Sequence, residues 1–205
     1  MKTTRPVGGF KGLIKSVNGD GSRGWVLAGI LALLLLLELG GTATLAALRY
    51  DRAALAEGQW WRLASAHLVH LDLRHALLNC LGLTLMWALF VRDYRARQWF
   101  LIVLAAAAGI DAGLWFRDTG VLWYVGASGV LHGVMAAGIL AEVRRGERGG
   151  LVLAALLAAK LGYEHWAGAL PFAGAAVPVV VNAHLYGVLG GLAAALWMRP
   201  EPVRL

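Results

Sequence analysis

Two residues far apart in the sequence could together supply a nucleophile and a general base. Ser128 lies in the tetrapeptide GASG at 126–129, and His184 lies in the pentapeptide AHLYG at 183–187. A serine hydroxyl is a weak nucleophile until an adjacent base takes its proton, and a neutral imidazole can take that proton and later give it to the leaving amine. The pair therefore predicts acyl-transfer chemistry, with Ser128 as nucleophile and His184 as base.

The position of Ser128 favours this chemistry but also allows a simpler explanation. The serine lies at the predicted start of a helix, where unpaired backbone N–H groups and the positive end of the helix dipole would stabilise an oxyanion. Gly126 and Gly129 would let a substrate backbone approach closely. A serine at a helix start is also a common N-cap, so the motif alone leaves both interpretations open.

Other polar residues interrupt apolar stretches. His75 and Asn79 are four residues apart, so both lie on one face of a helix. Polar side chains are costly inside a membrane, which makes each of them a candidate for function. The pair could instead form hydrogen bonds between helices, and Glu38 could either do the same or face the path of a substrate.

The composition indicates a membrane protein. The chain has 205 residues with a mean hydropathy of +0.64, and 59% of them are hydrophobic. Replacing the 5 Tyr in that count by the 27 Gly gives about 70%, against roughly 45–50% in soluble domains. Even a larger soluble domain buries only about 70% of its unfolded surface, so we do not expect a soluble single domain.

Six apolar runs approach the roughly 17–25 residues that a helix needs to cross a bilayer. They predict an all-α bundle of six transmembrane helices, near residues 25–48, 75–91, 99–116, 125–141, 151–166 and 179–198. This leaves a basic cytoplasmic tail at 1–24, a long outer connection at 49–74 and a cytoplasmic stub at 199–205. With both termini inside, 13 of the 19 Lys and Arg residues are cytoplasmic. The positive-inside rule thus explains the net charge of +7 without nucleic acid as a partner.

Small residues could bring the two chemical groups together. Gly129 and Gly133 form a stripe on the fourth predicted helix, and Gly187 and Gly191 form one on the sixth. Such stripes let membrane helices pack with their backbones close. If the two stripes face each other, Ser128 and His184 come within hydrogen-bonding distance. No residue on a third predicted helix looks like the buried carboxylate of a triad, so we expect a Ser–His dyad. Glu164 is assigned to the short connection between the fifth and sixth helices.

Three other classes of function fit the sequence less well. A metal protease could use five histidines near the outer face, namely His67, His70, His75, His132 and His184, but the His-Glu-x-x-His motif is absent. We therefore expect no metal and no other cofactor. A protein that binds membrane helices without cutting them would be expected to lack the nucleophile or the base. A channel would place polar residues along a path through the membrane, whereas here they gather toward one side.

The chain resembles the rhomboid intramembrane serine proteases across all six predicted helices. The matching pieces are Trp61-Arg62, His70, His75 with Asn79, the segment 126–129, and the segment 183–191. The resemblance implies that Ser128 and His184 form the catalytic dyad. It also implies that His75, Asn79 and the backbone N–H of Ser128 hold the oxyanion, and that the loop 49–74 lies partly in the membrane.

The chain departs from the common rhomboid pattern at one position, and there it resembles the rhombosortase branch. His132 stands one turn after the nucleophile, where rhomboids commonly have a tyrosine that packs on the catalytic histidine. His132 could stack on His184 in the same way, or it could be a hydrogen-bond partner of His184 or contact the substrate. The branch implies a bacterial inner-membrane enzyme with a periplasmic active site. Its substrates would carry a C-terminal Gly-Gly motif, a membrane helix and a basic tail, and a lipid-derived amine could replace water as acceptor.

Overall fold

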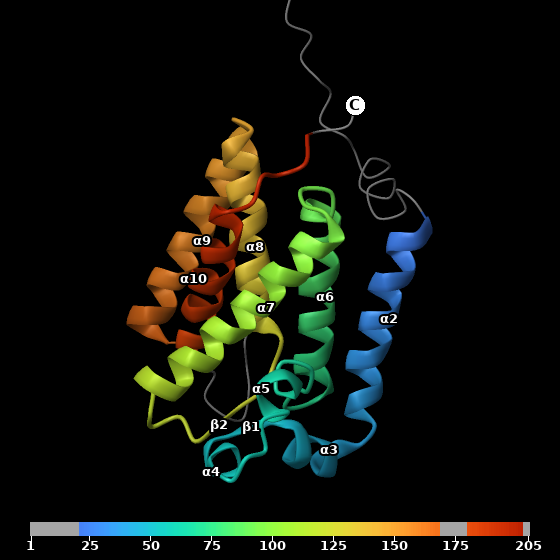
Figure 1. The fold of residues 1–205 in the computed structure, drawn as a ribbon, viewed down its shortest axis with the longest axis vertical. Helices are drawn as coiled ribbons and strands as arrows, with labels where there is room; N and C mark the ends of the chain where they lie inside the picture. Colours follow the sequence, from blue (N-terminus) through green and yellow to red (C-terminus); the bar gives the residue numbers. More distant parts are fainter. Residues whose placement is uncertain (1–20, 169–179, 203–205) are drawn as a thin grey trace, which may run out of the picture.

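The computed structural model describes residues 21–168 and 180–202, and this part of the chain is mostly helical. Successive long helices run in alternating directions, so the connections between them lie by turns at one end of the bundle and at the other (Figure 1). The six long helices are α2 (Gly21–Glu38), α6 (Leu73–Phe90), α7 (Ala96–Ala112), α8 (Ser128–Arg144), α9 (Arg148–Ala167) and α10 (Asn182–Leu196). Each predicted apolar run overlaps one of them. Most of the predicted tail, 1–24, lies outside the described residues.

The first apolar run is not a single helix, which corrects the prediction for residues 25–48. Helix α2 ends at Glu38, and α3 (Gly41–Leu48) leaves it at an angle of 109°. Gly41 has a φ of +55°, in the left-handed region that glycine enters without a Cβ clash. Hydrophobicity continues through the bend, which is why the apolar pattern did not reveal it.

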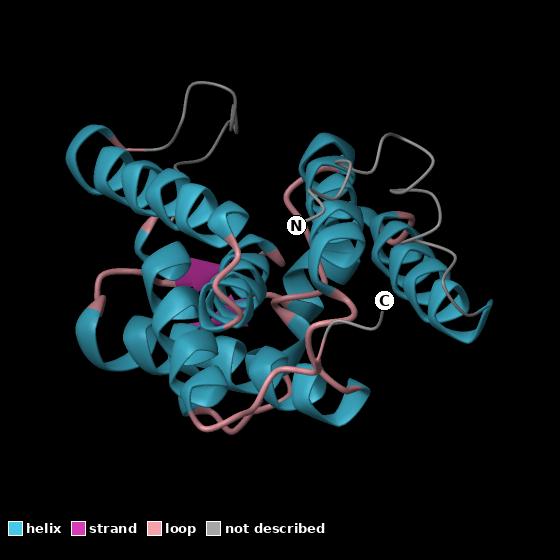
Figure 2. Ribbon diagram, turned by 90° about the horizontal axis from the view of Figure 1, so that it is seen from above, coloured by secondary structure: helices cyan, strands magenta, loops and turns pink. Residues whose placement is uncertain are grey.

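The long connection at 49–74 is also more ordered than the sequence suggested. It contains β1 (Tyr50–Asp51), α4 (Arg52–Ala56) and α5 (Arg62–Ser65). Strand β1 pairs in antiparallel register with β2 (Trp123–Tyr124), and Figure 2 shows this strand pair enclosed by helices. The buried Arg62 side chain donates to the carbonyls of Ala46 and Arg49, at 2.8 and 2.9 Å. This cation therefore satisfies carbonyls at the end of α3 that have no partner within the helix.

Two described helical segments are long and apolar enough to cross a membrane. They are Leu73–Phe90 and Ala96–Arg117, the second formed by α7 with the π-helical turn η1 (Gly113–Arg117). The bent pair α2–α3 makes a third if it counts as one span. Helix α10 has 15 residues, and at 1.5 Å per residue it is shorter than the roughly 30 Å of bilayer hydrocarbon. Six spans with both termini inside therefore remain a prediction.

Helix α10 packs closely against α7 and α8 through glycines. A Cβ at Gly187 would overlap the carbonyl oxygen of Gly129, and one at Gly191 would overlap that of Gly133. The predicted contact between the two glycine stripes is thus confirmed. A further contact was not predicted: a Cβ at Gly109 on α7 would lie 2.7 Å from the Tyr186 carbonyl oxygen and 3.2 Å from the Cα of Gly190. Backbones on two sides therefore hold α10 in place.

Candidate active site

Ser128 and His184 face each other where α8 and α10 begin. Ser128 is the first residue of α8, and its Oγ lies 3.0 Å from Nε2 of His184, the third residue of α10. The close approach follows from the glycine contacts, because a Cβ at Gly129 would lie 2.8 Å from the Ala183 carbonyl oxygen. The expected proximity of the two side chains is therefore observed. This is the hydrogen bond that a serine nucleophile requires of its base.

The turn before Ser128 is held from two sides. Gly126 has a φ of +116°, and its N–H donates to the carbonyl of Ala66 at 2.9 Å. The buried Tyr124 hydroxyl donates to the Gly126 carbonyl at 2.9 Å and accepts from the backbone N–H of Gly129. The turn that presents Ser128 is thus fixed by a tyrosine that sequence reasoning missed. No motif marks this residue, since its role depends on its place next to the turn.

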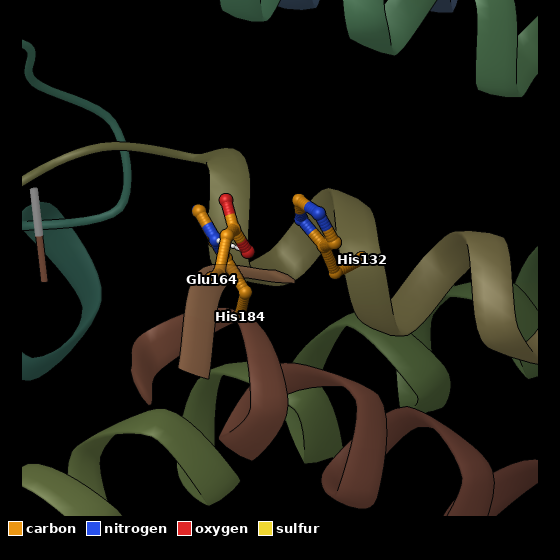
Figure 3. A group of neighbouring side chains, drawn as sticks. All are labelled: His132, Glu164 and His184. Atoms are coloured by element: carbon orange, nitrogen blue, oxygen red, sulfur yellow. Dashed lines mark hydrogen bonds and ion pairs between the residues drawn. The ribbon is translucent and has the colours of Figure 1, made fainter. Parts of the chain in front are cut away.

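A buried carboxylate contacts the other nitrogen of His184, which contradicts the expectation of a dyad without one. Nδ1 of His184 lies 2.9 Å from Oε2 of Glu164, and the Glu164 residue is only 4% exposed (Figure 3). Helix α9 continues to Ala167, so Glu164 belongs to the helix and not to the following loop. Lys160, one turn earlier, donates to Oε1 of Glu164 at 2.6 Å. A charge pair four residues apart in an apolar helix was the signal that could have found it.

His132 packs against the ring of His184. Its ring is stacked on His184, with centroids 4.2 Å apart and planes inclined by 18°. Nδ1 of His132 donates to the carbonyl of Ser128 at 2.7 Å, because a carbonyl oxygen can only accept. Of the interpretations of His132, the geometry matches stacking on His184.

The two predicted oxyanion residues lie in different settings. His75 and Ser128 both line a cavity of about 340 Å³, whose wall also includes Tyr124 and Val180. The described wall does not include Asn79, which is buried and donates through Nδ2 to the carbonyl of His75 at 3.0 Å. The structure thus brings His75 to the cavity with the serine and places Asn79 one turn further along α6.

The remaining polar candidates lie outside this group. Nε2 of His67 is 3.4 Å from Oδ1 of Asp111, and the ring of His70 packs edge-on against His75. Burial, together with the neighbouring His75, lowers the pKa of His70 to about 3, so its imidazole is neutral near pH 7. Glu38 accepts a hydrogen bond from the backbone of His70 and so joins α2 to the segment before α6.

His132, Glu164 and His184 are also the residues whose types and positions could hold a metal ion. Their ligand atoms lie within 4.8 Å of one another. These atoms are engaged already: both His184 nitrogens and both Glu164 oxygens have hydrogen-bond partners, as does Nδ1 of His132. The ammonium of Lys160 next to Glu164 also opposes a second cation. The arrangement suits proton transfer better than metal binding.

Comparison with known proteins places this arrangement in a family. A model of the Rhomboid domain matches residues 57–201, which is well over half of the chain. The chain is 32% identical over 107 residues to the rhomboid protease GluP of Bacillus subtilis (strain 168). The aligned part covers 50% of this chain and 21% of that protein, so the chain spans about a fifth of the length of this relative. With a domain match of this extent on an apolar helical bundle, the chain belongs to the rhomboid family of membrane proteins.

Proposed function

We propose that this protein is an intramembrane serine endopeptidase in which Ser128 is the nucleophile and His184 the general base. The observation that carries the proposal is the 3.0 Å hydrogen bond between Ser128 Oγ and His184 Nε2, formed where Ser128 borders a cavity. The likeness to a protein named as a rhomboid protease supports the same activity. A non-catalytic binder of membrane helices would have no use for this hydrogen bond.

The proposed reaction follows from these positions. Ser128 Oγ attacks the carbonyl carbon of the scissile bond while its proton passes to His184 Nε2. The oxyanion faces the first turn of α8, whose N–H groups have no partner within the helix. His75 assists from the cavity wall, and Asn79 would use the amide hydrogen that does not bind the carbonyl of His75. His184 then protonates the leaving amine, and water releases the acyl group in a second attack.

The proposed substrate is a membrane-anchored protein whose C-terminal region carries a Gly-Gly motif, a membrane helix and a basic tail. His132 in the place of the common tyrosine supports this rhombosortase-type specificity. Glycine weakens a helix by about 1 kcal/mol relative to alanine, so a Gly-Gly pair would unwind readily and leave room for attack. Transfer of the new C-terminus to a lipid-derived amine is a variant of the second step.

The proposed location is a bacterial inner membrane, with six spans, both termini inside and the active site open to the periplasm. The arrangement of charges supports this orientation. Ser128 begins α8 at one end of the bundle, while Arg144 and Arg145 lie at the other end of the same helix (Figure 1). The positive-inside rule assigns the second end to the cytoplasm.

The test uses the full chain, purified and reconstituted in lipid vesicles, with a Gly-Gly tail protein as substrate. Mass spectrometry of the products would identify the new C-terminus, including any attached amine. We expect cleavage by the wild type and no cleavage by Ser128→Ala. Ser65→Ala is the matched control, because it removes a hydroxyl that donates to the carbonyl of Leu48, away from the cavity. Identical products from wild type and Ser128→Ala, or substrate binding without cleavage by either, would refute the proposal.

A further inference from the structure

We propose that Glu164 is a positioning residue that turns the Ser128–His184 pair into a triad, with Lys160 holding the carboxylate in place. The inference rests on the proposed function, and it adds a third group to the chemistry. Three helices contribute to the arrangement: Ser128 from α8, Glu164 from α9 and His184 from α10. All three side chains are joined by hydrogen bonds of 3.0 and 2.9 Å.

The carboxylate selects the tautomer of His184 that the reaction requires. An ionised carboxylate can only accept hydrogen bonds, so the proton of neutral His184 resides on Nδ1, which faces Glu164 at 2.9 Å. Nε2 then presents its lone pair to the hydroxyl of Ser128. With the opposite tautomer, an N–H would face the serine and no base would be available.

The same carboxylate stabilises the charge that develops on His184. As Ser128 Oγ bonds to the substrate carbon, its proton moves to Nε2, and the imidazole becomes a cation. The Nδ1 proton stays on His184, and Glu164 remains ionised beside it. When the C–N bond of the substrate breaks, the Nε2 proton passes to the leaving nitrogen, and His184 returns to its first state. Because the site is buried, the attraction across 2.9 Å is screened less than it would be in water.

Lys160 explains how a carboxylate can stay ionised in an apolar helix. Its Nζ is 2.6 Å from Oε1 of Glu164, which leaves Oε2 to His184. The Lys160 side chain is 30% exposed, against 5% for Glu164, so the lysine reaches the surface of the protein while the carboxylate is enclosed. Each carboxylate oxygen thus has one partner, and this division fixes the direction in which Glu164 faces His184.

A purely structural ion pair between helices would make the same contacts, so the variants must separate the two roles. In Glu164→Gln, the amide oxygen can still accept from Lys160, and the amide NH₂ then donates to Nδ1 of His184. This leaves the packing intact but places the ring proton on Nε2, facing Ser128. In the double variant K160M/E164L, apolar residues of similar size replace both charges, a change that helices often tolerate without loss of stability.

The experiment follows the reaction of the full-length protein in detergent with a fluorophosphonate probe, which requires an activated serine. The saturation of the labelling rate separates the maximal rate of inactivation from probe affinity. We expect Glu164→Gln to reduce the maximal rate by about 10²–10⁴-fold with probe affinity within twofold, and Glu164→Asp to recover part of the loss. K160M/E164L should also react slowly while retaining the melting temperature of the wild type to within a few degrees.

The control variant and the possible contrary results distinguish a failure of the proposed protease activity from a failure of the proposed role of Glu164. Asp111→Asn is the control, because it neutralises a partly buried carboxylate beside another histidine, His67. This variant should react at the wild-type rate. Labelling of Ser128→Ala equal to that of the wild type would overturn the proposed protease itself. Labelling that requires Ser128 but proceeds at the wild-type rate in Glu164→Gln or K160M/E164L would overturn the triad alone.

Discussion

In the turn before Ser128, backbone conformation and side-chain packing each require a glycine at position 126. Its φ of +116° lies in a region that residues with a Cβ rarely adopt. A Cβ at this position would also lie 2.8 Å from Cε1 and 3.1 Å from Nε2 of His75, the histidine in the cavity wall. The glycine therefore sets both the direction in which the chain enters α8 and the distance between His75 and Ser128.

We expect Gly126→Ala to fold but to react at least tenfold more slowly than the wild type, because His75 must move and the turn is strained by about 1–2 kcal/mol. Fluorophosphonate labelling and a melting curve would measure the two effects. Gly146→Ala is the matched control: Gly146 also has a positive φ, +73°, but a Cβ there meets nothing within 4 Å. Labelling of Gly126→Ala as fast as that of Gly146→Ala would show that neither the strain at the turn nor the contact with His75 affects the reaction.

At the scale of helices, the sequence predicts where the long apolar helices lie and which glycines form their contacts. It does not predict where a helix bends or which buried side chains meet. The predicted runs locate six long helices because hydrophobicity measures burial in lipid directly. The bend between α2 and α3 and the strand pair β1–β2 were not predicted, since each depends on a few residues and on contacts distant in sequence.

Of the candidate site, Ser128, His184, His75 and His132 lie together as expected. Glu164 was missed because the sequence does not show that the last turn of α9 packs beside α10, where the carboxylate reaches His184.

The packing of α8 on α10 should tolerate no side chain at Gly187. We expect Gly187→Ala to cost about 1–3 kcal/mol of unfolding free energy, because the added Cβ overlaps the Gly129 carbonyl and the backbones must separate. Separation would also lengthen the hydrogen bond between Ser128 and His184, so labelling should slow. Denaturant titration in detergent measures the first effect and the fluorophosphonate probe the second.

Gly162→Ala on α9 is the matched control for that change, since a Cβ there meets nothing within 4 Å. Alanine favours a helix over glycine by about 1 kcal/mol, so this variant should be as stable as the wild type or more so. If Gly187→Ala behaved like Gly162→Ala, the backbones of α8 and α10 would not be in the contact described here.

Across the whole molecule, the two ends of the bundle are built from different interactions. The short helices and the strand pair lie together at one end of the bundle (Figure 1). The opposite end is held by charged side chains. There Arg144 donates to three carbonyls at the end of α10, those of Ala195, Leu196 and Met198. Arg145 binds Asp93, between α6 and α7, and Glu147. These guanidinium groups tie α6, α8 and α10 together at the end opposite Ser128.

The buried Asp93 should make stability fall as the pH rises through mildly acidic values. Burial raises the pKa of Asp93 from 3.8 to about 6, even though the Arg145 guanidinium favours the ionised form. The folded state thus binds this proton more tightly than the unfolded state, so the stabilisation is complete below pH 3.8 and is lost as the pH rises through 6. At 1.36 kcal/mol per pKa unit, the loss is about 3 kcal/mol. Denaturant titrations of wild type and Asp93→Asn between pH 4 and 7 would measure it.

This prediction concerns the difference in the pH dependence of unfolding free energy between the wild type and Asp93→Asn. The wild type alone would not suffice, because other groups also titrate between pH 4 and 7. The amide introduced by Asp93→Asn cannot ionise, so the fall between pH 4 and 7 should be smaller in the variant by about 2 kcal/mol, which is the part of the total that this pH range contains. Glu201→Gln removes another carboxylate of the same end, one that pairs with the exposed Arg95, and it should keep the wild-type slope. A slope unchanged in Asp93→Asn would mean that Arg145 compensates fully for burial, and the charged end would then be equally stable throughout this range.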